Sequence, residues 1–207
     1  DARVELLEDV KLEAKVMDVE GYALGRSYEI VASQLPEGVE NKIIALVDIG
    51  ANVTTFAVVE NGETSFVREQ TFGGEQVTQS ILSFYGMSYD QAEKAKLEGD
   101  LPRNYIFEVL SPFQIQLLQQ IKRTLQIYCT SNGKDKVDHI ILCGGTSKLE
   151  GMASLLTHEL DVHTIIADPF QGCLHADEDV KKILKPDISK YMIACGLALR
   201  SYAQWRT

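Results

Sequence analysis

The chain has 207 residues, of which 45% are hydrophobic, and its 20 Lys and Arg residues against 30 Asp and Glu residues give a formal net charge of −10. This composition is that of a globular protein with one large domain or two small ones, and it excludes a disordered or fibrous chain. The negative charge argues against nucleic acid or anionic lipid as a partner bound through a basic surface. The longest strongly apolar run, residues 191–199, is too short to span a bilayer, so no direct membrane insertion is expected.

Cysteine spacing indicates neither a zinc site nor a redox motif. The four cysteines form no CxxC pair, so buried reduced thiols in a cytoplasmic protein are expected.

The first 36 residues change pattern twice. Apolar positions predict a short helix over residues 4–10 and a helix over residues 19–32. Between them, residues 12–17 alternate between apolar and charged side chains, which predicts a strand. The turn-rich segment Gln34–Gly38 is the best candidate for a boundary.

Three consecutive strands are predicted after this break. Residues 43–47 form a nearly continuous apolar run, as in a strand buried on both faces. Strands over 53–59 and 64–72 follow, joined at Asn61-Gly62, a strong hairpin signal because both residues tolerate positive φ.

The rest of the chain predicts helices and two further strands. Helices are expected over 75–85 and 89–97, the second begun by a capping box at Ser88, and a long helix is expected after Ser111 as N-cap. The remaining predicted elements are a strand at 139–143, a helix at 149–160, a strand at 163–167 and a closing helix at 188–205. This order predicts an α/β fold with a mixed five-stranded sheet and a helical insertion.

Two glycine-rich turns follow predicted strands. In Asp48–Thr55 (DIGANVTT), a buried strand ends beside an acidic residue, and Gly50 lets the backbone turn closely around a ligand. Backbone amides in such a turn can cradle an anion, and an adjacent carboxylate can hold Mg²⁺ through water. On composition alone, a plain hairpin turn is the simpler interpretation.

The second turn, Gly144–Gly151 (GGTSKLEG), joins a strand to a helix, where glycines leave room for a flat ring against the backbone. A plain connection is again the alternative. Two such turns at strand ends together favour a ligand site, since ligands in α/β sheets gather at the carboxyl ends of strands. No P-loop, Rossmann, zincin or α/β-hydrolase motif is present in the sequence.

At these residues the sequence resembles the superfamily of actin, Hsp70 and the sugar kinases. The first turn resembles its second phosphate motif, the second turn its adenosine motif, and Val16–Leu24 its first connecting helix. More specifically, the chain resembles the PilM family of actin-like type IV pilus assembly proteins. Five segments carry this resemblance: DVEGYAL at 18–24, REQTFGG at 68–74, Leu101-Pro102, ADPF at 167–170 and ACGLALR at 194–200.

The resemblance implies the second domain of an actin-like ATPase (RNase H-like) fold. It implies that residues 1–36 end the first half (subdomain IC) and supply the connecting helix, that 37–75 and 136–207 form subdomain IIA, and that 76–135 form subdomain IIB. Nothing in the sequence matches the family's first phosphate motif, and the chain begins at Asp1, so we expect it to be the C-terminal part of a longer protein.

The resemblance also assigns site residues. Asp48 is expected near Mg²⁺ and the γ-phosphate, as a group that positions the metal or water. Glu75 is expected near the ribose, and Arg123 is a weaker candidate. The backbone and hydroxyl groups expected to line the nucleotide belong to Gly50, Asn52, Thr54, Thr55, Gly74, Gly144, Gly145 and Ser147.

The implied function is that of an ATP-binding cytoplasmic scaffold at the inner-membrane face, serving pilus assembly and twitching motility. It would bind the cytoplasmic N-terminus of PilN, mostly through the first half, and so tie PilO and PilP indirectly to the pilus motor ATPases. ATP and Mg²⁺ are the expected cofactors, with slow hydrolysis at most. The alternatives are an FtsA-like division protein, a sugar- or acetate-kinase-type enzyme fragment, and an interaction domain without nucleotide.

Overall fold

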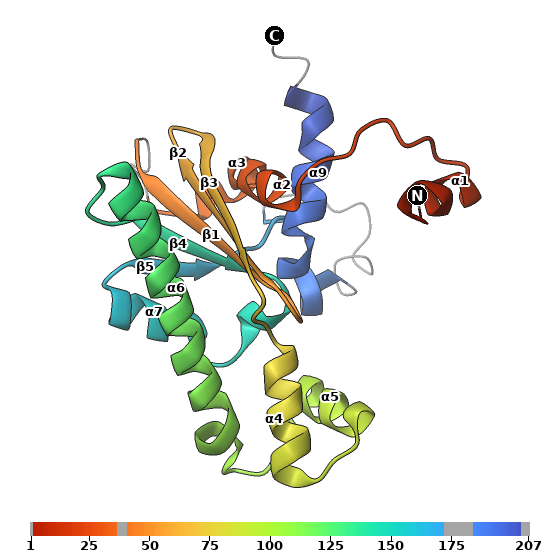
Figure 1. Cartoon of the computed structure of the whole chain (residues 1–207), viewed down its shortest axis with the longest axis vertical. Helices are drawn as coiled ribbons and strands as arrows, with labels where there is room; N and C mark the ends of the chain where they lie inside the picture. The colour runs from red at the N-terminus through yellow and green to blue at the C-terminus, as the bar shows by residue number, and fades with distance from the viewer. Residues whose placement is uncertain (1, 37–40, 172–183, 204–207) are drawn as a thin grey trace.

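A computed structural model describes residues 2–36, 41–171 and 184–203 of the chain. At its centre is a mixed five-stranded sheet in the order β3-β2-β1-β4-β5 (Figure 1). The antiparallel strands are β1 (Ile43–Ile49), β2 (Thr54–Glu60) and β3 (Glu63–Gln70), and β4 (His139–Cys143) and β5 (His163–Ile166) continue the sheet in parallel with β1. All five predicted strands of this domain are therefore confirmed.

The turn between β2 and β3 has the expected left-handed backbone. Asn61 has φ of 54° and Gly62 φ of 81°, the signs that a two-residue hairpin turn needs to match the twist of its strands. The pairing register slips once, between Val58 and Val59, before the hairpin closes. The three-strand meander predicted from sequence is thus correct in order and in turn type.

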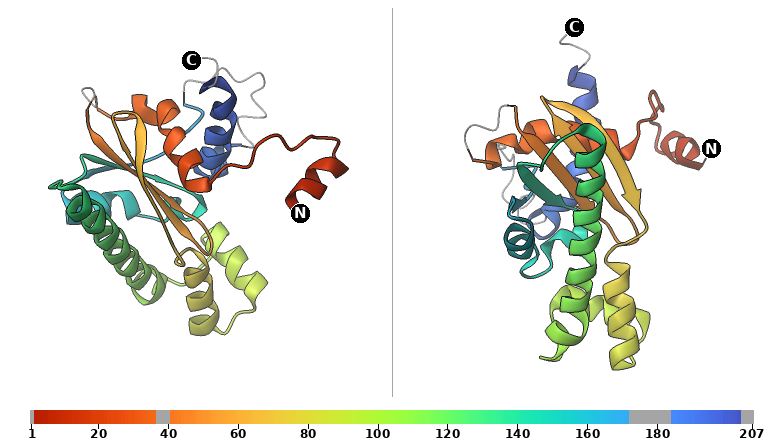
Figure 2. Two further views of the ribbon diagram at one scale, coloured as in Figure 1. Left: turned by 45° about the horizontal axis from the view of Figure 1, so that its top comes forward. Right: turned by 60° about the vertical axis from the view of Figure 1, so that its left-hand side comes forward.

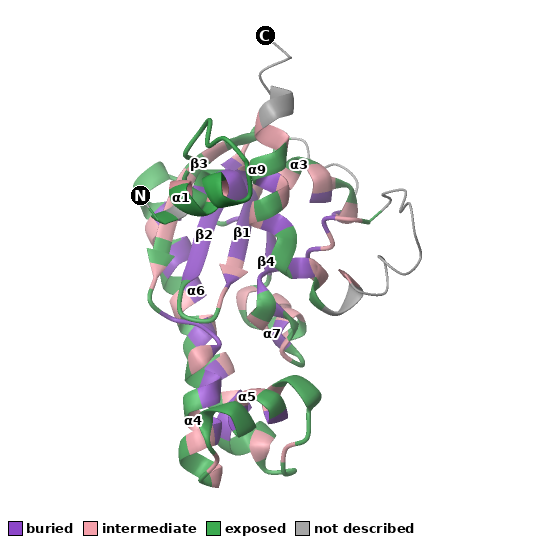
Figure 3. Ribbon diagram, turned by 90° about the vertical axis from the view of Figure 1, so that its right-hand side faces the viewer, coloured by how far each residue is buried: buried purple, intermediate pink, exposed green. Residues whose placement is uncertain are grey.

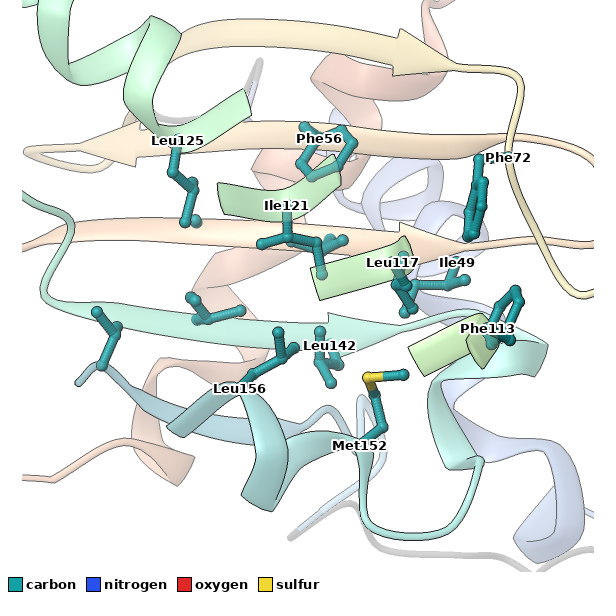
Figure 4. Packing of buried hydrophobic residues seen from close by; sticks show 14 of the residues in the cluster. Ile49, Phe56, Phe72, Phe113, Leu117, Ile121, Leu125, Leu142, Met152 and Leu156 are labelled. Carbon is teal, nitrogen blue, oxygen red and sulfur yellow. The ribbon is translucent and has the colours of Figure 1, made fainter. Parts of the chain in front are cut away.

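One face of the sheet is covered by the long helix α6 (Ser111–Asn132) and by α7 (Met152–Leu160) (Figure 2). Figure 4 shows this core, in which Phe113, Leu117 and Ile121 of α6 lie over the strands. Phe72, at the end of the sheet, stacks on Phe113 with a centroid separation of 5.2 Å.

The start of α6 differs from the prediction. Ser111 is not an N-cap, because a π-helical turn (Ile106–Leu110) runs directly into the helix with helical backbone angles on both sides of the junction. Pro112 therefore lies inside a continuous helical segment, at a place where the π-helical turn already changes the hydrogen-bond pattern.

The opposite face is covered by α2 (Glu20–Arg26), α3 (Tyr28–Val31) and α9 (Met192–Ala203). The predicted helix over 19–32 is therefore two short helices, followed by a 3₁₀ turn (Ala32–Gln34). The closing helix begins at Met192, after a kinked 3₁₀ segment (Lys185–Tyr191), and residues 204–205 of the prediction lie outside the described residues.

Helices α2 and α9 approach closely because glycine lies between them. A Cβ atom on Gly196 of α9 would lie 1.8 Å from the carbonyl oxygen of Ala23 in α2. Gly21 likewise lets α2 lie against Val67 of β3, where an added Cβ would meet a methyl carbon at 2.2 Å. This helix pair is consequently packed backbone against backbone.

Helices α4 (Glu75–Tyr85) and α5 (Tyr89–Glu98) extend beyond the end of the sheet (Figure 1). The predicted capping box at Ser88 is present: its hydroxyl accepts from the Gln91 amide, and the Gln91 side chain accepts from the Ser88 amide. This pair of helices is far less buried than the sheet, as Figure 3 shows. The division into subdomains stays a prediction. Helix α6 shares one hydrophobic core cluster with both the strands and this insertion.

The N-terminal segment lies apart from the sheet. Helix α1 (Ala2–Asp9) is followed by residues 12–19 in an extended path with no strand, so the predicted strand over 12–17 is wrong (Figure 1). Leu12, Val16 and Met17 are exposed, and none of them pairs with another described residue in a sheet. The described part of the chain contains no helix that is both long and apolar enough to cross a membrane.

Candidate functional site

The carboxyl ends of the parallel strands β1 and β4 bring the two glycine-rich turns together. Asp48 lies opposite Cys143 in the register, and Gly144 follows with φ of 84°, a conformation that favours glycine. A Cβ atom on Gly144 would lie 2.2 Å from Oδ1 of Asp48 and 2.5 Å from the carbonyl oxygen of Ile49. Only glycine therefore allows this strand end to lie against the Asp48 carboxylate.

The Asp48 carboxylate lies in a poorly solvated environment. Burial raises its pKa from 3.8 to about 6, and the negative charge of Glu20 adds to the effect. Among the described residues, no lysine, arginine or histidine is paired with this carboxylate, so it can accept a positive partner. The shift marks Asp48 as a functional candidate on physical grounds.

The carbonyl oxygen of Gly50 is the point where three segments meet. It accepts hydrogen bonds from the amide of Gly74, at 3.0 Å, and from the hydroxyl of Thr146, at 3.0 Å. The amide of Glu75 donates to the carbonyl of Ala51 at 2.8 Å. The first turn is thus fixed both to the N-terminus of α4 and to the second turn.

Gly73 makes this junction possible. Its Cβ position lies 2.4 Å from the carbonyl oxygen of Ala51 and 2.5 Å from that of Gly50, so a side chain would displace the turn. The amides of Ala51 and Asn52 donate to no other described residue. The exposed tip of the first turn therefore keeps two donors for an anion.

The two threonines of the first turn are buried. The Thr54 hydroxyl donates to the Phe72 carbonyl at 2.7 Å, and Thr55 is 4% exposed. Asn52 is exposed at the tip. Of the polar side chains expected in this turn, Asn52 has the most open position.

In the second turn, Ser147 is fully buried and holds the backbone in place. Its hydroxyl donates to the Gly144 carbonyl at 2.7 Å and lies 3.3 Å from the Ser189 hydroxyl. Gly145 is exposed, and the Lys190 side chain lies over it, 2.8 Å from the position of an added Cβ. Lys190 in turn pairs with Asp187 at 2.7 Å.

Two expected site residues have other neighbours. Glu75 accepts from Tyr89 at 2.8 Å and from Gln79 at 2.7 Å, so its carboxylate joins α4 to α5. Arg123 lies on α6 beside β3, in a hollow that it shares with Arg68. The structure thus brings Asp48, Gly50, Gly74, Gly144 and Gly145 together, while Arg123 lines a different part of the surface.

Glu20 and Thr146 were not expected at this junction from the sequence. Glu20 begins α2 and lies near enough to Asp48 for its charge to raise the Asp48 pKa, and Thr146 links the two turns. The only signal for Thr146 was its place within the second turn. Nothing in the sequence pattern connects Glu20 with Asp48.

Solved structures of actin-like proteins share this fold. A structure described as a PilM-PilN type IV pilus biogenesis complex superimposes with a TM-score of 0.75 and 26% identity, covering 96% of this chain and 56% of the other. The ethanolamine utilization protein EutJ from Carboxydothermus hydrogenoformans superimposes with a TM-score of 0.67 and 19% identity. The match covers 96% of this chain and 59% of EutJ. MreB 5 of Spiroplasma citri bound to AMPPNP superimposes with a TM-score of 0.58 and 14% identity. The match covers 99% of this chain and 64% of the MreB 5 chain.

Sequence comparison gives two further findings. The cell division protein FtsA of Bacillus subtilis (strain 168) is 28% identical over 160 residues, which are 67% of this chain and 36% of FtsA. The chain therefore spans between about one third and two thirds of the length of these relatives. The model of the family described as type IV pilus assembly protein PilM matches residues 1–202. This chain belongs to the PilM family of actin-like type IV pilus assembly proteins.

Proposed function

We propose that this chain forms the second half of an ATP-binding scaffold in type IV pilus assembly. The observation that carries the proposal is the junction at the Gly50 carbonyl, which holds the two glycine-rich turns and the Asp48 carboxylate at one edge of the sheet. The matched relatives include an actin-like protein with bound AMPPNP, which supports a nucleotide as the ligand.

The residues at this edge fit a magnesium nucleotide. Glycines at positions 50 and 144 leave the strand ends free of side chains, and the free amides of Ala51 and Asn52 suit phosphate oxygens. Asp48, with Glu20 nearby, would hold Mg²⁺ through water. The bound ion would supply positive charge that neutralises the phosphates. Gly145 and Lys190 would lie toward the nucleoside.

The partner in this proposal is the cytoplasmic N-terminus of PilN. The support is the family itself and the likeness to a PilM-PilN complex. PilO, PilP and the motor ATPases would be reached through PilN at the cytoplasmic face of the inner membrane. An FtsA-like division role is the weaker alternative, because FtsA matches over 67% of the chain while the PilM model matches residues 1–202.

Nuclear magnetic resonance of the ¹⁵N-labelled chain tests the nucleotide site even when affinity is low. Addition of Mg-ATP should shift the amide signals of Gly50, Gly144 and Gly145, while those of Gly62 and Gly133, in distant turns, serve as internal controls. Asp48→Asn should abolish the Mg²⁺ dependence of these shifts. Asp100→Asn, an equal charge change on the exposed insertion, should leave it intact. Unchanged signals at all three glycines with Mg-ATP would contradict the proposed site.

A further inference from the structure

The hollow that Arg68 and Arg123 share lies between β3 and α6, on the side of the sheet that α6 covers. Its volume is about 300 Å³, which is the lower end of the range for small-ligand pockets. It is lined by Arg68, Gln70, Thr71, Phe72, Gln120 and Arg123. Five of these six side chains are polar, and none is acidic.

Two arginines from different elements line this hollow. Arg68 comes from β3 and Arg123 from α6, and neither has a salt bridge or hydrogen bond to another residue in the described part of the chain. By contrast, Arg26 and Arg200 of the same protein are both paired with Asp18. In a protein with a net charge of −10, two unpaired arginines facing one hollow indicate a site for an external anion.

Gln70 supplies an acceptor at the same place. Its amide nitrogen donates to the Thr124 hydroxyl at 2.6 Å, which fixes the side chain. Its Oε1 atom is buried and has no hydrogen-bond partner. A buried orphan acceptor costs free energy unless a ligand donates to it. The hollow therefore suits a ligand that carries both negative charge and a proton to donate.

Phosphate has this combination at neutral pH, whereas sulfate carries no proton. We infer that the hollow between β3 and α6 binds inorganic phosphate, which keeps at least one proton at neutral pH. Arg68 and Arg123 would each donate to its oxygens, and the P–OH group would donate to Oε1 of Gln70. This inference is independent of the proposed nucleotide site, since it uses none of the residues at the Gly50 junction.

Titration of the ¹⁵N-labelled chain with inorganic phosphate tests the inference. The amide signals of Thr71 and Phe72 and the side-chain amide of Gln70 should shift in a saturable manner, and sulfate should bind more weakly. Arg68→Gln or Arg123→Gln should weaken phosphate binding about tenfold, as expected for loss of a charged hydrogen bond. Gln70→Leu should remove the preference for phosphate over sulfate.

Lys122→Gln is the matched control, because Lys122 precedes Arg123 on α6, carries the same charge and does not line the hollow. It should leave the phosphate affinity unchanged. A parallel titration with glycerol 3-phosphate, a monoester that has mostly lost its second proton at pH 7, should show weaker binding than inorganic phosphate. The inference is overturned if the signals of the hollow do not respond to millimolar phosphate, if sulfate binds as tightly, or if Lys122→Gln weakens binding as much as Arg123→Gln. Asp48→Asn should have no effect, which separates this site from the nucleotide site.

Discussion

The carboxylate of Asp18 and the guanidinium of Arg200 lie 2.8 Å apart, and this ion pair joins the segment before α2 to helix α9. Arg26 approaches the same carboxylate at 3.0 Å and also donates to the carbonyl of Gly196 at 2.9 Å. The segment before α2, α2 itself and α9 are therefore tied together by one acidic side chain that is 8% exposed.

Asp18 makes stability depend on acid pH. Burial alone would raise its pKa, but hydrogen bonds from Arg200, the Val19 amide and Arg26 outweigh burial and lower the pKa from 3.8 to about 2. A lowered folded-state pKa stabilises the fold above pH 3.8, and this stabilisation is lost as the pH falls through about 2. Asp18→Asn should reduce the free energy of unfolding by about 2 kcal/mol at pH 7, measured by urea denaturation, and the difference should shrink toward pH 2. An equal loss at both pH values would contradict the ionic explanation.

Asp48 should show the opposite dependence. Its pKa is raised to about 6, so the folded state disfavours the charged form, and the stability present below pH 3.8 is lost as the pH rises through about 6. Asp48→Asn should therefore raise the unfolding free energy at pH 8 by about 1–2 kcal/mol and change it little at pH 4. Asp138→Asn is the control with the reverse sign, because Asp138 accepts from the Ile43 amide at 2.8 Å and its pKa is lowered. A lower free energy of unfolding for Asp48→Asn at pH 8 would contradict this interpretation.

Gly196 should tolerate no side chain. The Cβ of an alanine would lie 1.8 Å from a backbone oxygen of α2, which no rotamer change relieves. Gly196→Ala should lower the free energy of unfolding by about 3 kcal/mol, despite the better helix propensity of alanine. Thermal denaturation measures this effect. Ala194→Ser, on the exposed side of the same helix, should cost less than about 0.5 kcal/mol. Similar losses for both would refute the close approach.

The capping box of α5 gives a local test. Ser88→Ala removes the hydroxyl that accepts from the Gln91 amide, and should cost about 1 kcal/mol. Ser83→Ala, at an exposed position on α4, is the matched control and should be neutral or slightly stabilising. Chemical denaturation followed by circular dichroism compares the two. If Ser88→Ala left the free energy of unfolding unchanged, water would be replacing the Ser88 hydroxyl as the partner of the Gln91 amide.

The sheet could be predicted because its strands are short apolar runs bounded by clear turns. Ile43–Ile49 and His139–Cys143 are buried on both faces, and their patterns admit few other structures. The same reasoning failed at residues 12–17, where alternation was real but no described strand lies alongside to pair with. The prediction that Ser111 is an N-cap was wrong because a π-helical turn directly before it already has helical backbone angles.

The candidate site was predictable in part for the same reason. Asp48 and Gly144 could be expected at one site because they lie at the ends of neighbouring parallel strands, which finish at the same edge of the sheet. The contacts of Thr146 and Glu20 depend on how the turns and α2 pack in three dimensions, and no spacing in the sequence encodes them. Ser147 shows the reverse case: a residue expected to face a ligand is buried against Ser189.

The shared carbonyl of Gly50 couples the edge of the sheet to the helical insertion. Because the Gly74 and Glu75 amides hold the first turn, α4 cannot tilt without pulling on the Gly50 and Ala51 carbonyls. Helix α4 has 11 residues, about 16 Å in length, so it acts as a lever whose pivot is the turn itself. A small rotation at this pivot becomes a larger sweep at the far tip, where α5 is attached.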